Sequence, residues 1–417
     1  MRVLYVIIVG GLLKLTYRRF FTMLQQFSNR VSGLKASAIR EILKFTADPE
    51  VISFAAGNPA PEAFPTEVIA KLSAEIFAEE PINALQYSIT EGYAPLRELI
   101  FADLTKKGLA KSGDAVVITA GAQQAIETTA KIFCNEGDVI ICEDPSFIGS
   151  LNAFRSYGAR LVGVPMDDEG MRADMLEQAL KDNPTARFIY TIPNFQNPTG
   201  KTSSLARRKE ILALAKKYGV YILEDNPYGA LRFAGEDIPC IKELDNDGIV
   251  LYAGTFSKTL APGLRVGYLL GSSEIVGKAV VGLQTSTVHT NIWAQMLTYR
   301  FLTTVDFDEH LKKLREIYRK KCSRMLSGLK ENLPDFITLT EPQGGLFIWA
   351  TIPERFDMNS FCKEAVLRKV AVVPGNAFCA DDNAVSHSFR LNFSTPTDEQ
   401  IDKGVKILGA AAAELLV

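Results

Sequence analysis

A single lysine in a hydroxyl-rich turn is the side chain best suited to covalent chemistry. Residues 255–267 read TFSKTLAPGLRVG, which places Lys258 near Thr255 and Ser257 and ahead of Arg265. A lysine amine can form a Schiff base with an aldehyde, while hydroxyl groups and a guanidinium can bind phosphate. The segment therefore indicates a site for a phosphorylated aldehyde, such as pyridoxal 5′-phosphate (PLP). The alternative is a surface lysine in a Ser/Thr loop, because most lysines are exposed.

The elements around this turn predict where it lies. An apolar run at 249–253 precedes Lys258 and predicts a buried strand. Six more runs of strand length alternate with helical segments such as 122–133, 174–181 and 205–218; these runs are 116–120, 139–142, 161–164, 188–191, 221–223 and 266–270. The alternation predicts an α/β domain with a mostly parallel seven-stranded sheet flanked by helices. Open sheets of this kind bind ligands at strand ends, where Lys258 is expected.

Two further candidates follow earlier strands. The chain runs from a strand into a helix through Gly121, and backbone N–H groups at such a helix start can bind phosphate. Phe147 closes the next strand and can stack on an aromatic ring. The alternative for Phe147 is an ordinary place in the core.

Amide, carboxylate and phenol groups follow the next two strands. The turn 193–200, PNFQNPTG, contains Asn197, and Asp225 and Tyr228 follow the strand 221–223. A buried carboxylate needs a cation, and the protonated pyridine nitrogen of PLP is one. Tyr228 and Asn197 can then meet the phenolate oxygen of the ring. A purely structural turn would explain the prolines and glycine of 193–200. It would not explain why Asn197 should face the crevice of the sheet, as we expect.

The chain changes character after about residue 300. A long charged helix at 307–329, short strands at 337–339, 346–350 and 389–393, and a terminal helix at 397–416 predict a smaller α+β domain. Arg390 lies in the last strand, where a buried guanidinium suits a substrate α-carboxylate; the alternative is a local salt bridge. The expected divisions are an N-terminal extension at 1–22, a segment at 23–65 that packs with the small domain, a large PLP-binding domain at 66–300 and a small domain at 301–417.

Composition excludes several classes of function. The chain has 417 residues, with 46 basic and 48 acidic side chains, so nucleic acid is not an expected partner. Six cysteines without CxxC spacing indicate reduced thiols in a cytoplasmic protein, and three histidines without ligand spacing predict no metal site. The apolar run 3–13, flanked by basic residues, is similar to the start of a signal peptide but too short to span a membrane. We expect no membrane association.

The motifs taken together resemble a known family. The order GAQQ, PNFQNPTG, EDNPYG, TFSKTLAPGLRVGY, PQGGLFIW and FRLNFS closely resembles that of class I/II aminotransferases, PLP-dependent enzymes of fold type I. The subgroup containing 2-aminoadipate (kynurenine) aminotransferases is especially similar, from about Arg30 to the C-terminus. The resemblance implies a Schiff base at Lys258, contact of Asp225 with the pyridine nitrogen, and contact of Asn197 and Tyr228 with the ring hydroxyl.

The resemblance also implies the remaining contacts. Arg390 is expected to bind the α-carboxylate, and Tyr87 to reach the phosphate of the other subunit in a homodimer. Relatives often have tyrosine where this chain has Phe147, which keeps the aromatic face and loses a hydroxyl. The implied phosphate ligands are Gly121, Ala122, Gln123, Thr255, Ser257 and Arg265.

Substrate candidates include Gly57, in a glycine- and proline-rich loop, and Arg40, which in some relatives corresponds to an arginine that binds a side-chain carboxylate. The alternative for Arg40 is a solvated charge on a helix surface. The predicted reaction transfers an amino group between an L-amino acid (2-aminoadipate, glutamate, aromatic or branched-chain) and a 2-oxo acid, with Lys258 moving the proton. A PLP-dependent lyase or synthase would share every cofactor residue. A non-catalytic effector-binding module is a further alternative, although 22 residues before Met23 are too few for a DNA-binding domain.

Overall fold

The computed structural model describes residues 27–32, 34 and 48–415. The chain forms two compact units, residues 1–35 and 36–417. In the first unit, the described residues include a short helix, α2 (Asn29–Ser32). The predicted extension 1–22 and the helix expected to contain Arg40 lie outside the described residues. The predicted boundaries at 65/66 and 300/301 stay predictions.

A large sheet organises the second unit. Its eight strands, counted in the described part of the chain, have the order β2-β9-β8-β7-β6-β3-β4-β5. The neighbours β8, β7, β6, β3 and β4 are parallel, whereas β9 runs antiparallel to both β8 and β2. The strands are β2 (Asp114–Thr119), β3 (Val139–Asp144), β4 (Arg160–Asp167), β5 (Gly170–Met171), β6 (Phe188–Thr191), β7 (Tyr221–Asp225), β8 (Val250–Thr255) and β9 (Gly267–Ser272).

The seven predicted strands are all present, and one more extends the sheet. β5 has only two residues and pairs antiparallel with the end of β4 at the sheet edge. The sequence does not predict this strand, because two residues are too short for an alternating pattern. The α/β fold with a mostly parallel sheet is confirmed.

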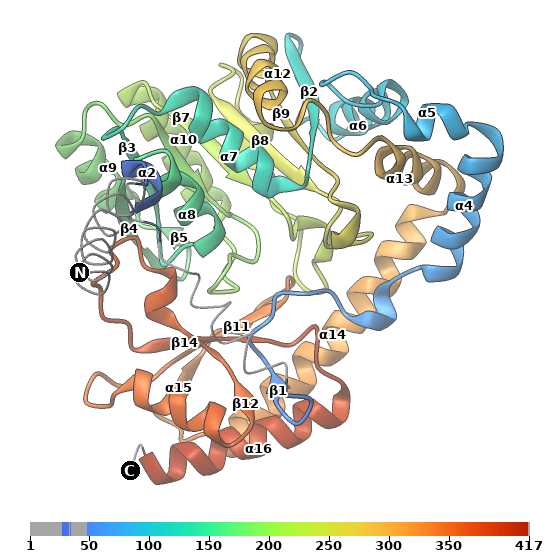
Figure 1. Cartoon of the computed structure of the whole chain (residues 1–417). Coiled ribbons are helices and arrows are strands. Elements are labelled where there is room, and N and C mark those ends of the chain that lie inside the picture. Colours follow the sequence, from blue (N-terminus) through green and yellow to red (C-terminus); the bar gives the residue numbers. More distant parts are fainter. Residues whose placement is uncertain (1–26, 33, 35–47, 416–417) are drawn as a thin grey trace, which may run out of the picture. The chain divides into compact units, whose positions relative to one another are not determined.

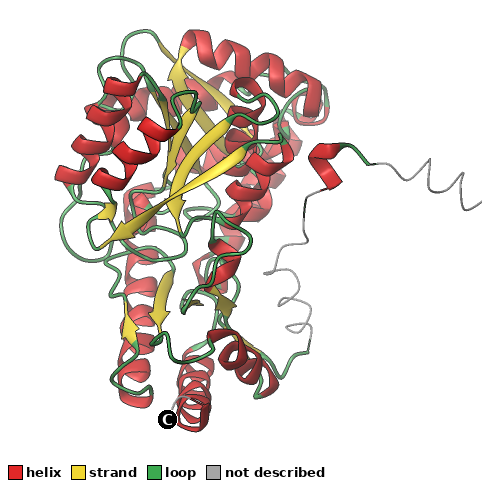
Figure 2. Ribbon diagram, turned by 90° about the vertical axis from the view of Figure 1, so that its left-hand side faces the viewer, coloured by secondary structure: helices red, strands yellow, loops and turns green. Residues whose placement is uncertain are grey.

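Alternating side chains of each strand enter two separate cores, and this explains why helices cover both faces. In β3, Ile140 and Cys142 pack in one core with α7 (Ala122–Phe133), while Val139 and Ile141 pack in the other. The second core also contains α9 (Ala173–Asp182) and α10 (Leu205–Tyr218). A strand with both faces covered is apolar throughout, as the sequence of β3 is. Figure 1 and Figure 2 show the strands of the large sheet between these helices.

A third core lies towards the β2 edge of the sheet. Here α4 (Thr66–Glu79), α6 (Ala94–Lys106) and α13 (Ile292–Thr304) pack against side chains from β2, β8 and β9. The remaining helices of this part are α5 (Pro81–Leu85), α8 (Ile148–Ser156), α11 (Ile241–Leu244) and α12 (Ser273–Thr287).

A smaller four-stranded antiparallel sheet, in the described part, has the order β10-β11-β14-β13. It accompanies α14 (Phe307–Asn332), α15 (Met358–Leu367) and α16 (Asp398–Leu415). Its strands are β10 (Thr338–Leu339), β11 (Phe347–Thr351), β13 (Val373–Pro374) and β14 (Ser388–Asn392). Nearby, β1 (Ile52–Ser53) pairs parallel with β12 (Val370–Ala371), and the backbone N–H of Asn392 donates to the carbonyl of Phe54 at 2.8 Å. Residues 52–54 are therefore attached to elements near the C-terminus.

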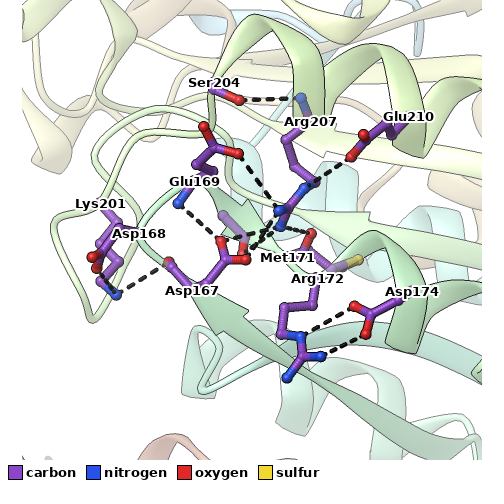
Figure 3. A network of polar contacts seen from close by, with 11 residues as sticks. Asp167, Asp168, Glu169, Met171, Arg172, Asp174, Lys201, Ser204, Arg207 and Glu210 are labelled. Carbon is purple, nitrogen blue, oxygen red and sulfur yellow. Dashed lines mark hydrogen bonds and ion pairs between the residues drawn. The ribbon is translucent and has the colours of Figure 1, made fainter.

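A cluster of charges around Arg207 fixes α10 to the β4–β5 hairpin. The Arg207 guanidinium donates to both carboxylate oxygens of Asp167, to the carbonyls of Gly170 and Met171, and to Glu210 (Figure 3). Each of its nitrogens therefore has an acceptor. We call this set, Arg207 with its five acceptors on four residues, the Arg207 cluster.

Among the described residues, no helix is both long enough and apolar enough to cross a membrane.

Candidate active site

A cavity of about 430 Å³ collects most of the predicted site residues. It lies where β7 and β8 end, because Asp225 is the last residue of β7 and Lys258 follows β8 by three residues. The predicted residues that line it are Gly57, Ala122, Gln123, Phe147, Asn197, Asp225, Tyr228, Thr255, Ser257, Lys258, Arg265 and Arg390. Residues from the beginning, middle and end of the chain thus share one cavity.

Lys258 is a partly buried amine without a carboxylate partner among the described residues. Its Nζ donates a hydrogen bond to the carbonyl oxygen of Gly57 at 2.8 Å. Burial, together with the positive charges of Arg390 and Arg265, lowers the pKa of Lys258 to about 8. At pH 7 roughly a tenth of such amines are neutral, compared with well under a thousandth for an ordinary lysine. The site therefore favours a nucleophilic amine, and the surface-loop alternative is excluded.

Asp225 is a buried carboxylate with one free oxygen. Its Oδ2 accepts a hydrogen bond from the Tyr190 hydroxyl at 2.8 Å, whereas Oδ1 has no partner among the described residues. Burial raises the pKa of Asp225 to about 7; the Tyr190 hydrogen bond opposes this effect, and the nearby Glu143 adds to it. A buried acceptor without a donor is costly, so Oδ1 suits an N–H cation. The pyridine nitrogen of PLP fits this requirement.

Arg390 faces the cavity from β14. Its Nη1 donates to Asn197 Oδ1 at 2.8 Å and its Nη2 to the carbonyl of Ala55 at 2.7 Å. Nε has no partner, and no ion pair to Arg390 is present among the described residues. Burial lowers the pKa of Arg390 to about 10. The local salt bridge considered from the sequence is therefore not formed, and the guanidinium is left to pair with an anion in the cavity.

Two aromatic rings hold the Arg390 guanidinium in place. Its Cζ lies 4.3 Å from the ring centroid of Phe347 and 4.9 Å from that of Phe378. Phe347 also makes an edge contact with Tyr228, with 5.8 Å between centroids. Cation–π contacts of this kind orient a guanidinium without neutralising it.

Asn197 connects Arg390 to Tyr228. Its Oδ1 accepts from Arg390, while its Nδ2 donates to the Tyr228 hydroxyl at 3.4 Å. Burial raises the pKa of Tyr228, so its phenol stays protonated at neutral pH. The Asn197 amide and the Tyr228 hydroxyl are therefore neighbouring hydrogen-bond donors, which suits the ring oxygen of PLP.

A set of donors at the start of α7 fits a phosphate group. Thr255 Oγ1 and Ser257 Oγ lie 2.9 Å apart, and Arg265 Nη1 donates to Ser257 Oγ at 3.5 Å. Gly121, the N-cap of α7, has φ 75°, and a Cβ there would lie 2.6 Å from Arg265 Nη2. A glycine is thus required for the helix start and the guanidinium to come together. Gly121 does not line the cavity itself, unlike Ala122 and Gln123 that follow it.

Phe147 forms a wall of the cavity at the start of α8. It is partly buried, and a Cβ at Gly149 would lie 2.5 Å from its Cζ and 2.7 Å from Gln123 Oε1. Gln123 Nε2 donates to the Gly149 carbonyl at 2.9 Å. The Phe147 ring and the Gln123 amide therefore pack against the backbone of Gly149, which has no side chain. The ring lines the cavity and does not lie wholly in the core.

One predicted site residue, Tyr87, lies elsewhere. Tyr87 is 83% exposed, does not line this cavity, and makes an edge contact with His289 at 5.9 Å between ring centroids. Arg40 lies outside the described residues. The position of Tyr87 leaves its predicted role across a subunit interface as a prediction.

Sequence reasoning missed Tyr190 and the aromatic holders of Arg390. Tyr190 is fully buried in β6, and Phe347 was quoted only as part of a motif. A tyrosine in the otherwise apolar strand FIYT was the one available signal, because a buried phenol needs a hydrogen-bond partner.

Comparison with known proteins agrees with this geometry. A family model described as "Aminotransferase class I and II" matches residues 49–408. An aromatic-amino-acid aminotransferase 1 from Thermococcus litoralis is 40% identical, over 93% of this chain and 94% of its own length. A 2-aminoadipate transaminase from Thermus thermophilus is 38% identical, over 94% and 98%.

A solved structure is also very similar. The kynurenine aminotransferase of Pyrococcus horikoshii, determined in complex with PMP, superposes with a TM-score of 0.91 at 37% identity and covers 95% of this chain and 98% of its own. The similarity extends over both sheets of the second unit, and not only over the motifs that surround the cavity.

Proposed function

Because the chain belongs to the class I and II aminotransferase family and is a PLP-dependent enzyme, we propose that it moves an amino group between an L-amino acid and a 2-oxo acid with Lys258 as its covalent cofactor residue. The observation that carries this proposal is one cavity that is lined both by Asp225, the last residue of β7, and by Lys258, which follows the neighbouring parallel strand β8. The two groups are thus available to opposite parts of one small molecule.

The proposed cofactor contacts follow from the chemistry of each group. Asp225 receives the pyridine N–H, Asn197 and Tyr228 meet the ring oxygen, and Phe147 covers one ring face. When bound, PLP supplies an electrophilic carbon and a ring that withdraws electrons from the substrate Cα. The phosphate is assigned to Thr255, Ser257, Arg265 and the α7 start at Gly121, Ala122 and Gln123.

Lys258 and Arg390 are assigned the substrate steps. Arg390 binds the α-carboxylate through its cavity-facing donors, which orients the substrate Cα towards the Lys258 amine. The Lys258 Nζ would then accept the proton from the substrate Cα and carry it, a role that suits an amine whose pKa is lowered to about 8. Gly57 accepts the hydrogen bond of the resting amine and releases it when the amine moves.

The test is a half-reaction without an acceptor. PLP-loaded protein mixed with one L-amino acid should release one equivalent of 2-oxo acid and keep the amino group, which a second 2-oxo acid then removes. A lyase or synthase would release either no 2-oxo acid or, after β-elimination, a 2-oxo acid together with free ammonia in repeated turnovers, and an effector-binding module would bind amino acids without releasing any 2-oxo acid. Either result would contradict the proposal, and D-amino acids serve as controls.

Substrate choice is proposed from the relatives, whose names specify aromatic amino acids, 2-aminoadipate and kynurenine. We infer that the chain accepts 2-aminoadipate, glutamate, aromatic or branched-chain amino acids, with Arg40 as the candidate for a side-chain carboxylate. The described cavity offers Lys258, Arg265 and Arg390 as its cations, and each already has a proposed partner. Comparing glutamate and 2-aminoadipate with leucine and phenylalanine, in the wild type and in Arg40→Ala, tests this. An unchanged preference would exclude Arg40.

We also propose a homodimer in which Tyr87 completes the partner's phosphate site. Ile82, Leu85 and Ile89, close to Tyr87, are 71%, 73% and 53% exposed, which is unusual for aliphatic side chains in a monomer. Co-expression of Tyr87→Ala and Lys258→Ala chains should restore activity, because a mixed dimer contains one site with both residues intact. Failure to restore activity in a purified mixed dimer would contradict the role of Tyr87.

For the compartment, we propose the cytoplasm. Support comes from the six cysteines, which are all free thiols, three of them buried in the hydrophobic core. Cell fractionation with an antibody to the native protein tests this proposal.

A further inference from the structure

A chain of two buried hydroxyl groups stands behind Asp225. The Ser150 hydroxyl of α8 donates to Tyr190 Oη at 2.7 Å, and Tyr190 donates to Asp225 Oδ2 at 2.8 Å. Both hydroxyl residues are 0% exposed, and neither lines the cavity. These two hydrogen bonds therefore connect α8, β6 and β7 and end at the Asp225 carboxylate.

The direction of these hydrogen bonds is fixed by proton count. A phenol has one proton, and the Tyr190 oxygen already accepts the Ser150 proton. Its own proton is consequently committed to Asp225. Burial raises the pKa of Tyr190 well above the ordinary value, so the phenol remains a donor at every pH at which the protein functions.

The arrangement leaves Asp225 with one occupied and one free oxygen. Oδ2 is held by Tyr190, while Oδ1 has no partner among the described residues. Holding one oxygen fixes the rotation of the carboxylate, and a donor to the carboxylate favours its charged form against burial and the nearby Glu143. The edge contact of the Tyr190 ring with Phe154, at 5.3 Å between centroids, holds the phenol itself.

We propose that Tyr190, supported by Ser150, is a positioning residue that aims the free Asp225 oxygen at the cofactor's ring nitrogen and keeps the carboxylate charged. The proposal rests on the proposed role of Asp225. In the absence of this donor, the proton shared by the ring nitrogen and Asp225 would shift towards the carboxylate, and the ring would lose its positive charge. Tyr190 would thus act on the cofactor without touching it.

The test measures cofactor affinity in the apoenzyme with two ligands. One is PLP, and the other is its 1-deaza analogue, in which a C–H replaces the ring nitrogen. Tyr190→Phe should weaken PLP binding about ten- to hundredfold, as expected for a lost hydrogen bond to a charged group, and should leave binding of the analogue unchanged. Ser150→Ala should give a smaller loss with the same selectivity.

Tyr318→Phe is the matched control. Tyr318 is equally buried, and its hydroxyl accepts only the backbone N–H of Ala60 among the hydrogen bonds of the described residues. Its variant should bind both ligands as the wild type does. If Tyr190→Phe weakened both ligands equally, or neither, the inference would be overturned.

Two further outcomes separate this inference from the proposed function. A wild type that binds PLP and the analogue equally would refute the Asp225 assignment itself. A wild type that prefers PLP, with Tyr190→Phe keeping that preference, would refute only the role of Tyr190. If Tyr190→Phe does not fold, Ser150→Ala carries the test, and an unchanged preference in that variant overturns the inference.

Discussion

The Arg207 cluster and the Lys258 cavity place buried charges in opposite situations. In the Arg207 cluster each guanidinium nitrogen has an acceptor. In the cavity, Asp225 Oδ1 and Arg390 Nε lack partners among the described residues. Both regions are rich in charge, but only the cavity has hydrogen-bonding capacity left for a ligand.

The pKa shifts of the two regions have opposite directions. Burial alone would lower the pKa of Arg207 and raise that of Asp167, but the hydrogen bonds and opposite charges around each group together outweigh burial, so the charged forms are favoured. In the cavity burial dominates: the pKa of Lys258 falls, that of Arg390 falls and that of Asp225 rises. The comparison teaches that a structural cluster stabilises its charges internally, whereas a binding cavity leaves them to be stabilised by what it binds.

Among the variants of these two regions, Lys258→Ala should cause the largest loss of activity. It removes the amine that we propose to hold the cofactor and move the proton, so turnover should fall by about 10⁴-fold or more and the visible absorbance of the bound cofactor should disappear. Lys201→Ala is the control, because Lys201 pairs with Asp168 next to the Arg207 cluster. Visible absorbance retained in Lys258→Ala, or an equal loss in Lys201→Ala, would contradict the assignment.

Asp225→Asn should have the next largest effect on activity. It removes the charge opposite the ring nitrogen, and kcat should fall by roughly 10²- to 10³-fold. The same variant should stabilise the cofactor-free protein above pH 7.

The sign follows from linkage. The pKa of Asp225 is raised to about 7 from an unfolded value near ~3.9, so its contribution to stability is complete below pH ~4 and is lost as the pH rises through about 7. At pH 8 the loss amounts to about 4 kcal/mol at most. Urea unfolding of the wild-type and Asp225→Asn apoenzymes at pH 4 and pH 8 measures this loss. The free energy of unfolding of the variant, relative to that of the wild type, should be higher at pH 8 than at pH 4. An unchanged difference would contradict the raised pKa.

Arg390→Lys should have an intermediate effect. Lysine keeps the charge but not the forked donors, so kcat/KM for amino acids should fall about ten- to hundredfold, mainly through KM. An amine substrate without a carboxylate should be converted at the wild-type rate. A similar loss for both substrates would indicate that Arg390 acts on the fold and not on the α-carboxylate.

Arg207→Met should affect activity least. Because Asp167 and Glu210 are partly exposed, the free energy of unfolding should fall by about 1–3 kcal/mol, less than for a fully buried pair. The activity of the folded variant should stay within about twofold of the wild type. A tenfold loss in the folded protein would remove the distinction between the two regions.

Local patterns predicted much of the fold. The helices 122–133 and 205–218 occur with the bounds expected from periodicity and end signals, and seven strands of the large sheet were predicted. Helices α12 and α13 were not predicted. In α12 the residues Gly277 and Gly282 and the hydroxyl-rich end 285–287 have low helix propensity, so its formation depends on packing of Val276, Ala279 and Leu283.

The site was predictable as far as each residue follows a strand, as Asp225 and Lys258 do. The contacts between distant residues were not. Tyr190 lies in a predicted strand, but alternation does not specify that its hydroxyl reaches Asp225 on the neighbouring strand. The sandwich of Arg390 between Phe347 and Phe378 likewise depends on how separate elements meet.

The attachment of residues 54–58 to late parts of the chain has a consequence for biosynthesis. The hydrogen bond from Arg390 to Ala55 spans 335 residues, and that from Ser394 to Asn58 spans 336. A ribosome releases this early segment long before either partner is made, so the segment has to wait unpaired while the large sheet is translated. Arg390, the proposed ligand of the substrate α-carboxylate, therefore gains its backbone anchor only after the whole large sheet has been translated, which makes the proposed carboxylate recognition a late acquisition of the nascent chain.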